Sequence, residues 1–309
     1  MFDSTLVLPY YRRILGGQKK YTNHTTLIHG ILTQENNHSF ILDDDGSRHF
    51  EDRIIWEGYL HHWEGQTVFA RELSQRDYET NTPIIICWPD VPDPKEPFVD
   101  LYYNERLIKY FASLFGHTAI NVNGAIFNFS HLMNENEIMA KEEYFYRPAL
   151  GEFAPSPNNG VFEILDDGRA FYDKFGRNFM RTIHRVRILG LDTESLMAVL
   201  KSSLDKILAT PPNPSAPEKY RDFSFFSNNC ATVIRDGLQA IGYTEIQGRF
   251  PRDMFVSGAY HLSKDKKLKV TYDRLPQLMV PDAPKSVVSP LMNPWNYSRV
   301  KELRIFETS

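Results

Sequence analysis

The chain has 309 residues, of which 42% are hydrophobic, 24% charged and 13% aromatic, a composition typical of globular proteins with one large or two ordinary domains. Its formal net charge of -4 excludes a general electrostatic attraction to nucleic acid. No apolar run approaches the roughly 18 residues that a membrane-spanning helix needs. We therefore predict neither a nucleic-acid partner nor a transmembrane segment.

The amino-terminal residues 1–17 contain no basic segment followed by an apolar stretch and a small-residue cleavage site, which is the pattern of a secretory signal. We predict synthesis in the cytoplasm without a signal peptide. Export by a signal-independent system, with action at a cell envelope, stays compatible with this pattern.

Residues 1–95 are predicted to form a small accessory domain. Short runs rich in β-branched and aromatic side chains alternate with turn-forming residues, and they cover residues 25–32, 38–42, 48–50, 65–70 and 83–88. Short strands at this spacing predict a small β-barrel, and their order resembles an OB-type barrel. The domain boundary is predicted at 91–97, where three prolines in seven residues exclude a helix.

Residues 96–309 are predicted to form a second domain of α+β class. A helix is expected at 100–115, because Leu107, Ile108, Phe111 and Leu114 can share one face. Two strands at 117–122 and 125–130 flank Asn123-Gly124, the strongest short hairpin signal.

A further strand is predicted at 183–189, followed by a helix at 193–208 that Asp192 or Thr193 can cap. Another helix is predicted at 230–241, where Gly242 fits the stop. The chain beyond about residue 263 is expected to be strand fragments and proline-rich coil, which form an extended carboxyl-terminal segment.

Two cysteines, Cys87 and Cys230, are too few for a disulfide framework, and no cysteine or histidine spacing resembles a zinc site. The sequence therefore predicts neither a metal nor a cofactor. Cys87 lies in an apolar run and is expected in the core. At least one cysteine is then free for chemistry or for packing.

Cys230 follows Asn229 at the predicted start of a helix. A helix N-terminus offers unpaired N–H groups and a partial positive charge, which favour a thiolate and can hold an oxyanion. Asn229 and Cys230 are therefore the predicted oxyanion region. The alternative is an inert cysteine that packs on an amphipathic helix.

His117 opens the first strand of the predicted hairpin and is the candidate base for Cys230. Asn128, on the second strand, can orient its imidazole, as in a Cys-His-Asn triad. His131 is the alternative for this third position. Asn128 is favoured by counting back from the turn, but the register of the two strands is not determined by sequence.

Three motifs in this order resemble a bacterial, envelope-associated branch of the permuted NlpC/p60 papain-like superfamily. They are Phe115-Gly116-His117-Thr118, Phe127-Asn128-Phe129, and Asn228-Asn229-Cys230-Ala231-Thr232 followed by Arg235-Asp236. The resemblance covers about residues 100–262. The order histidine, asparagine, cysteine is also that of the lecithin:retinol acyltransferase-like enzymes, which handle acyl chains.

The resemblance implies a permuted papain-like domain with an antiparallel sheet and helices, and acyl transfer through a thioester on Cys230. It favours a phospholipid acyl hydrolase, and a secreted antibacterial effector with a secretion or immunity partner would fit. The alternatives are a peptidoglycan amidase or endopeptidase, and a non-catalytic binding protein with a degenerate site.

Overall fold

A computed structural model describes residues 26–53, 57–76, 83–107, 114–131, 136–148, 154–155, 162–163, 176–213, 216–220, 222–278 and 285–306. Two larger antiparallel sheets and several helices make up this part of the chain, so the predicted α+β class is confirmed. The expectation about a signal peptide concerns residues 1–17, which lie outside the described residues.

The first sheet has five strands in the order β3-β2-β1-β4-β5, with a short helix inserted after β3. Their bounds are β1 Ile28–Glu35, β2 His38–Asp43, β3 Arg48–His49, α2 Glu57–Trp63, β4 Thr67–Arg76 and β5 Pro83–Pro89. The expected strands are present with small shifts. Among the described residues β3 and β5 do not pair with each other, so the sheet stays open and no closed barrel forms.

The second sheet has six strands in the order β15-β12-β6-β7-β8-β9. Its strands are β6 Phe98–Asn104, β7 His117–Val122, β8 Ala125–Asn128, β9 Glu137–Met139, β12 Ile183–Leu189 and β15 Lys269–Leu275. The helices around it are α3 Lys141–Tyr146, α5 Arg177–Met180, α6 Thr193–Ala209, α7 Cys230–Ala240, α8 Pro251–Lys264 and α9 Trp295–Leu303. Two short ladders pair β10 Ala154–Pro155 with β11 Phe162–Glu163, and β13 Pro212–Asn213 with β14 Ala216–Tyr220.

The prediction of a helix at 100–115 is wrong for residues 100–104, because these residues belong to the strand β6. All seven residues of β6 are buried, and the strand pairs with β12 on one side and β7 on the other. A strand buried on both faces loses the alternation that distinguishes it from a helix. Residues 108–113 of the expected helix lie outside the described residues.

Several elements are confirmed within one or two residues. The Asn123-Gly124 turn joins β7 to β8 with both residues at positive φ, +51° and +90°. The strand expected at 183–189 is β12. Asp192 caps α6, because its side chain accepts a hydrogen bond from the Ser195 N–H at 3.0 Å.

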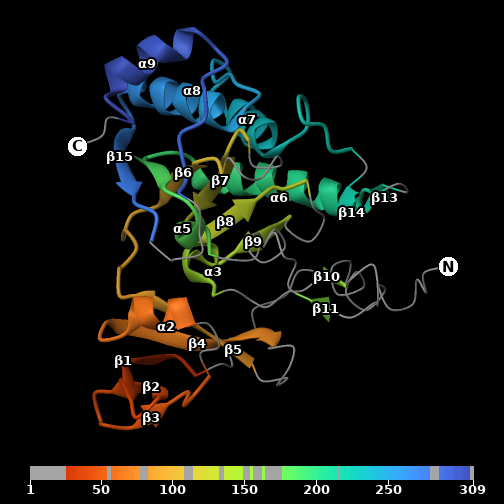
Figure 1. Cartoon of the computed structure of the whole chain (residues 1–309). Coiled ribbons are helices and arrows are strands. Elements are labelled where there is room, and N and C mark those ends of the chain that lie inside the picture. The colour runs from red at the N-terminus through yellow and green to blue at the C-terminus, as the bar shows by residue number, and fades with distance from the viewer. Residues whose placement is uncertain are drawn as a thin grey trace, which may run out of the picture.

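The six-stranded sheet has a different helix layer on each face. Helices α6, α7 and α8 bury their apolar side chains against one face, in a core that includes Tyr103, Ile120 and Phe127. Helix α3 covers the other face, where Tyr144 and Phe145 pack with partners such as Tyr102, Ala119 and Ile126. Figure 1 shows this sheet between its helices, with the first sheet below it.

Helices α8 and α9 were not expected from the sequence, where coil was predicted for the segment that ends in α9. Buried polar contacts hold this segment. Asp253 accepts hydrogen bonds from the N–H groups of Met292 and Asn293 and from Asn296 Nδ2. Such contacts come from side chains far apart in the chain, so local sequence patterns do not reveal them.

A buried histidine network fastens the same segment to the sheet. The His184 ring bonds to Tyr272 Oη through Nδ1 at 2.7 Å and to Glu105 Oε1 through Nε2 at 3.0 Å. Ser286 Oγ donates to the other Glu105 oxygen at 2.8 Å. A neutral His184 with its proton on Nε2 satisfies both ring nitrogens, since a carboxylate accepts and a phenol donates.

The two predicted domains share a core. Residues 90–97, between β5 and β6, carry no helix or strand. Trp63 of the first part packs edge-on to Tyr146 and Phe179 of the second, at ring distances of 5.6 and 6.5 Å. Tyr59 Oη donates to the Tyr146 carbonyl at 2.8 Å. The predicted chain division at 95/96 therefore does not divide the apolar interior.

Candidate active site

Cys230 is the first residue of α7, and Asn229 caps that helix. The Asn229 side-chain oxygen accepts hydrogen bonds from the N–H groups of Ala231 at 2.9 Å and Thr232 at 3.1 Å. The Asn229 N–H in turn donates to Thr232 Oγ1 at 2.8 Å, which completes a capping box. This cap holds the helix start, and with it the backbone of Cys230, in one position.

The side chain of Asn229 is used fully by this cap and by the loops around it. Its amide nitrogen donates to the carbonyls of Phe225 at 2.8 Å and Arg249 at 3.1 Å. It therefore positions the helix start and does not offer a donor to an oxyanion. The Cys230 N–H has no hydrogen-bond partner in another residue within the part of the chain that the structure describes, so it is the donor available there.

His117 and Asn128 meet across the β7–β8 hairpin. The register pairs Asn128 with Ala119, which makes His117 its diagonal neighbour. His117 Nε2 lies 2.7 Å from the Asn128 amide oxygen. An amide oxygen only accepts, so Nε2 carries the proton and Nδ1 is left as the basic nitrogen.

Cys230 and His117 line one cavity with a volume of about 60 Å³. His131, the alternative third residue, lines it too, and its ring lies 5.7 Å from that of Phe223. The structure therefore brings the candidate residues together, with Asn128 bonded to His117. Ligand pockets commonly measure roughly 300–1,000 Å³, so this cavity fits the reacting group of a substrate while the rest lies outside.

The cavity lies at the end of the sheet where β7 begins and β8 ends, and residues from both faces of the sheet reach it there. His117 pairs with Asn104, whose side chain donates to Tyr144 Oη on the α3 face. The next residue, Thr118, pairs with Tyr103 and so lies on the face toward α7. Base and nucleophile thus approach the cavity from opposite faces of β7.

Gly116 lets the chain enter β7 beside His117. Its φ is +76°, in the left-handed region that favours glycine. A Cβ at this position would lie 2.5 Å from the Asn104 carbonyl oxygen and 2.8 Å from a Tyr103 ring carbon. Any other residue would push β7 and its histidine away from β6.

The electrostatic setting of Cys230 differs from the expectation of a readily formed thiolate. Burial raises the pKa of the Cys230 thiol, while the N–H and hydroxyl of Thr118 and the first N–H groups of α7 lower it only in part. The thiol is therefore protonated at rest, and it needs a base to react. Cys87 is fully buried, which confirms its place in the core, and burial raises the pKa of its thiol.

Four phenylalanines at the cavity are here called the aromatic rim. Phe115, Phe225 and Phe250 line the cavity, and Phe226 packs against Phe225 and Phe250. Neighbouring rings stand 4.6 to 6.1 Å apart, and the Phe226 side chain is 60% exposed. The sequence-based reasoning missed the rim, although the Phe-Phe pair just before Asn228-Asn229 was a visible signal.

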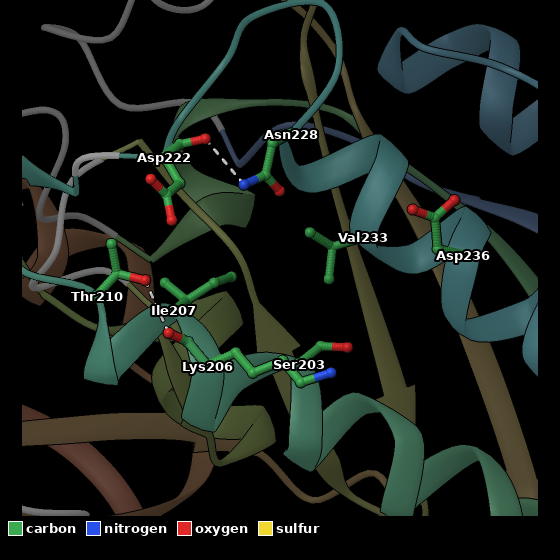
Figure 2. Close-up of a pocket in the computed structure, with 8 residues that line it drawn as sticks. All are labelled: Ser203, Lys206, Ile207, Thr210, Asp222, Asn228, Val233 and Asp236. Atoms are coloured by element: carbon green, nitrogen blue, oxygen red, sulfur yellow. Dashed lines mark hydrogen bonds between the residues drawn. The ribbon is translucent and has the colours of Figure 1, made fainter.

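A second hollow of about 220 Å³ lies between α6 and α7. Figure 2 shows Ser203 and Lys206 of α6 on one side and Val233 and Asp236 of α7 on the other, with Asn228 donating to the Asp222 carbonyl at the edge. Neither Cys230 nor a histidine lines it. The hydroxyls in its lining, those of Ser203 and Thr210, donate to backbone carbonyls of α6, so we place the chemistry in the smaller cavity.

The described residues contain no group of three or more His, Cys, Asp or Glu side chains placed to hold a metal ion. No helix among them combines the length and the hydropathy that crossing a bilayer requires. Comparison of the chain with protein-family models, with curated proteins and with solved structures found no match.

Proposed function

We propose that this protein is a cysteine-dependent acyl hydrolase or acyltransferase with Cys230 as nucleophile, His117 as base and Asn128 as the residue that orients the base. The observation that carries the proposal is the 2.7 Å contact between His117 Nε2 and Asn128 Oδ1, made by a histidine that shares a cavity with Cys230. Nucleophile, base and orienting group in reach of one another define this class of site.

The architecture agrees with a permuted papain-like domain. A helix that begins at the cysteine packs on an antiparallel sheet that carries the histidine and the asparagine. The chain order is His117, Asn128, Cys230, as in the permuted enzymes. For the first part we retain an OB-like fold, because OB folds are five-stranded and partly open and the sheet here has five strands with a gap between β3 and β5.

The reaction begins when the Cys230 thiol proton passes to Nδ1 of His117 and the sulfur attacks the substrate carbonyl carbon. The Cys230 N–H donates to the resulting oxyanion. His117 then gives the proton to the leaving oxygen, the carbon–oxygen bond breaks, and a thioester remains on Cys230. Water attacks the thioester with His117 as base, which releases a carboxylic acid and returns the proton to sulfur. A second acceptor in place of water gives acyl transfer.

The aromatic rim favours an apolar acyl ester over a peptidoglycan peptide. Three of its rings, Phe115, Phe225 and Phe250, line the cavity, and the Phe226 ring beside them is largely exposed to solvent. Aromatic rings bury large apolar areas when an acyl chain lies against them, whereas a peptide stem needs hydrogen-bonding partners. We therefore infer a lipid ester, of which a membrane phospholipid is one source. An envelope-acting antibacterial effector is one role for such an enzyme.

The test compares three forms of the full chain: wild type, Cys230→Ala and Cys87→Ala. Each is incubated with phospholipid vesicles and, separately, with peptidoglycan sacculi. Wild type and Cys87→Ala should release free fatty acid, and Cys230→Ala should lose at least about a thousandfold in rate while circular dichroism shows it folded. New amine termini from sacculi would favour the peptidoglycan alternative, and unchanged lipid hydrolysis by Cys230→Ala would overturn the proposal.

A further inference from the structure

Thr118 is next to the proposed base in the chain, and its side chain faces the helix that begins at the proposed nucleophile. It directly follows His117 in β7, and it pairs with Tyr103 of β6. Tyr103 belongs to the core beneath α7 and α8, so the pleat turns Thr118 toward the helix that begins at Cys230. The Thr118 side chain is 0% exposed. Solvent therefore does not reach its hydroxyl.

The hydroxyl of Thr118 has an unusual setting for a buried polar group. Among the described residues, its oxygen makes no hydrogen bond of good geometry, although buried hydroxyls are nearly always paired because an unpaired one is costly. Burial raises the pKa of the Cys230 thiol, and the Thr118 N–H and hydroxyl lower it. Thr118 thus faces the start of α7, and both of its donors act on the Cys230 sulfur in the direction that favours a thiolate.

We propose that Thr118 holds the catalytic thiolate: its N–H and its hydroxyl donate to Sγ of Cys230 once the thiol proton has moved to His117. A neutral thiol is a weak acceptor, so the hydroxyl is left poorly satisfied at rest. A thiolate is charged, and hydrogen bonds to charged acceptors are about twice as strong as neutral ones. The contact strengthens when the sulfur becomes reactive.

In this arrangement two neighbouring residues of β7 have complementary roles in the proton transfer from Cys230. His117 receives the proton, and Thr118 stabilises the anion that the transfer leaves behind. The donors are fixed by the strand and by burial before the reaction starts, which is the condition for electrostatic stabilisation without reorganisation. The assignment rests on the proposed role of Cys230 as nucleophile and adds a residue that touches the reacting atom.

The experiment measures thiolate formation without any substrate. The full chain and its variants are alkylated with iodoacetamide across pH 6–10, and peptide masses locate the adduct on Cys230. Thr118→Val removes the hydroxyl at nearly constant volume, and Thr118→Ser retains it. Thr182→Val is the matched control, because Thr182 is also buried and accepts a hydrogen bond from the Gln277 N–H away from the cavity.

We expect Thr118→Val to raise the apparent pKa of Cys230 alkylation by about one to two units, which is the strength of one hydrogen bond to a charged group converted at 1.36 kcal/mol per unit. Thr118→Ser should stay close to wild type, and so should Thr182→Val. If Thr118→Val does not fold, Thr118→Ala carries the same expectation, since it only removes atoms.

An unchanged alkylation profile in folded Thr118→Val or Thr118→Ala overturns the proposal, and so does a Thr118→Ser profile that matches the valine variant. The outcome is separate from that of the proposed function. A protein that hydrolyses no acyl ester can still show the alkylation shift, and an active hydrolase can lack it.

Discussion

The proposed role of His117 as base requires one ring orientation, and the contact with Asn128 selects that orientation. The Asn128 side chain is 2% exposed, so its bond to His117 Nε2 competes little with water. Because that bond places the ring proton on Nε2, Nδ1 is the basic nitrogen that would take the proton of Cys230 in the proposed reaction. His131 lines the same cavity, so the two candidates can be separated only by their effects on the reaction.

We predict that Asn128→Ala lowers kcat by about 10- to 1,000-fold, because His117 loses the partner that fixes its tautomer. The change in KM should be small, since Asn128 does not line the cavity. His131→Ala should leave kcat within about threefold. Steady-state kinetics of both variants on the same ester make the comparison. A larger loss in His131→Ala than in Asn128→Ala would transfer the orienting role to His131.

At the scale of elements, the start of α7 matters most. The Asn229 side chain bonds to two N–H groups of α7 and to the carbonyls of Phe225 and Arg249. It thereby ties the helix start to the loops that carry Phe225, Phe226 and Phe250 of the aromatic rim. Asp192 caps α6 through its bond to the Ser195 N–H, but that end of α6 carries none of the cavity-lining residues. A comparison of variants at the two caps therefore separates an effect on helix stability from an effect on the geometry of the cavity.

We predict that Asn229→Ala and Asp192→Ala each lower the free energy of unfolding by about 1–2 kcal/mol, the usual cost of losing an N-cap. Only Asn229→Ala should also lower kcat, because it releases the backbone at Cys230 and the rim loops. Urea unfolding and initial rates provide the two readouts. Equal kcat in both variants would show that the cap acts on stability alone.

On the scale of the whole molecule, the shared core joins the first sheet to the second. Leu32, Ile41 and Trp63 lie in one apolar cluster with Phe179 and Met180. Ion pairs reinforce this contact at its edge, where the Arg71 guanidinium lies 2.7 Å from Glu142 and 2.8 Å from Glu143. Removing either part would expose this apolar surface. The described parts should therefore unfold together.

We predict a single cooperative unfolding transition, which Trp63→Ala shifts by about 3–5 kcal/mol as expected for a buried aromatic residue. Trp63 is 2% exposed and lies against Tyr146 and Phe179 of the second part. Near-UV circular dichroism and hydrolase activity should be lost at the same urea concentration. Activity that survives the unfolding of the first sheet would contradict a shared core.

The buried His184 network makes whole-molecule stability depend on pH. Burial lowers the pKa of His184 from its ordinary value of 6.5. Burial raises the pKa of Glu105, but hydrogen bonds from His184 and Ser286 lower it further, to below its ordinary value of 4.5. Both groups release protons more readily in the folded state than in the unfolded chain. Their contribution is therefore present above the unfolded pKa and is lost as the pH falls.

We predict that the free energy of unfolding begins to decrease as the pH falls below about 6.5 and decreases again below about 4.5. His184→Gln, which keeps a donor for Glu105, should remove the first of these decreases. His61→Gln should retain it, because the His61 side chain is 87% exposed. Urea unfolding at several pH values measures the slopes. A His184→Gln slope equal to that of wild type would assign the acid sensitivity to other groups.

The sequence by itself determined the elements whose signals are local. The Asn123-Gly124 turn, the cap at Asp192 and the cap at Asn229 each depend on contacts within about four residues, so the β7–β8 hairpin and helices α6 and α7 were predictable. The candidate residues Cys230, His117 and Asn128 followed from their places on these elements and from the motifs around them.

Only the tertiary structure decided what depends on distant contacts. The sequence of β6 favours a helix, because burial on both faces removes the alternation typical of a strand. Helices α8 and α9 are held together by contacts between Asp253 and the carboxyl-terminal segment. The register that sets His117 beside Asn128 comes from strand pairing. The partial burial of Cys230, which raises the pKa of its thiol, arises from packing.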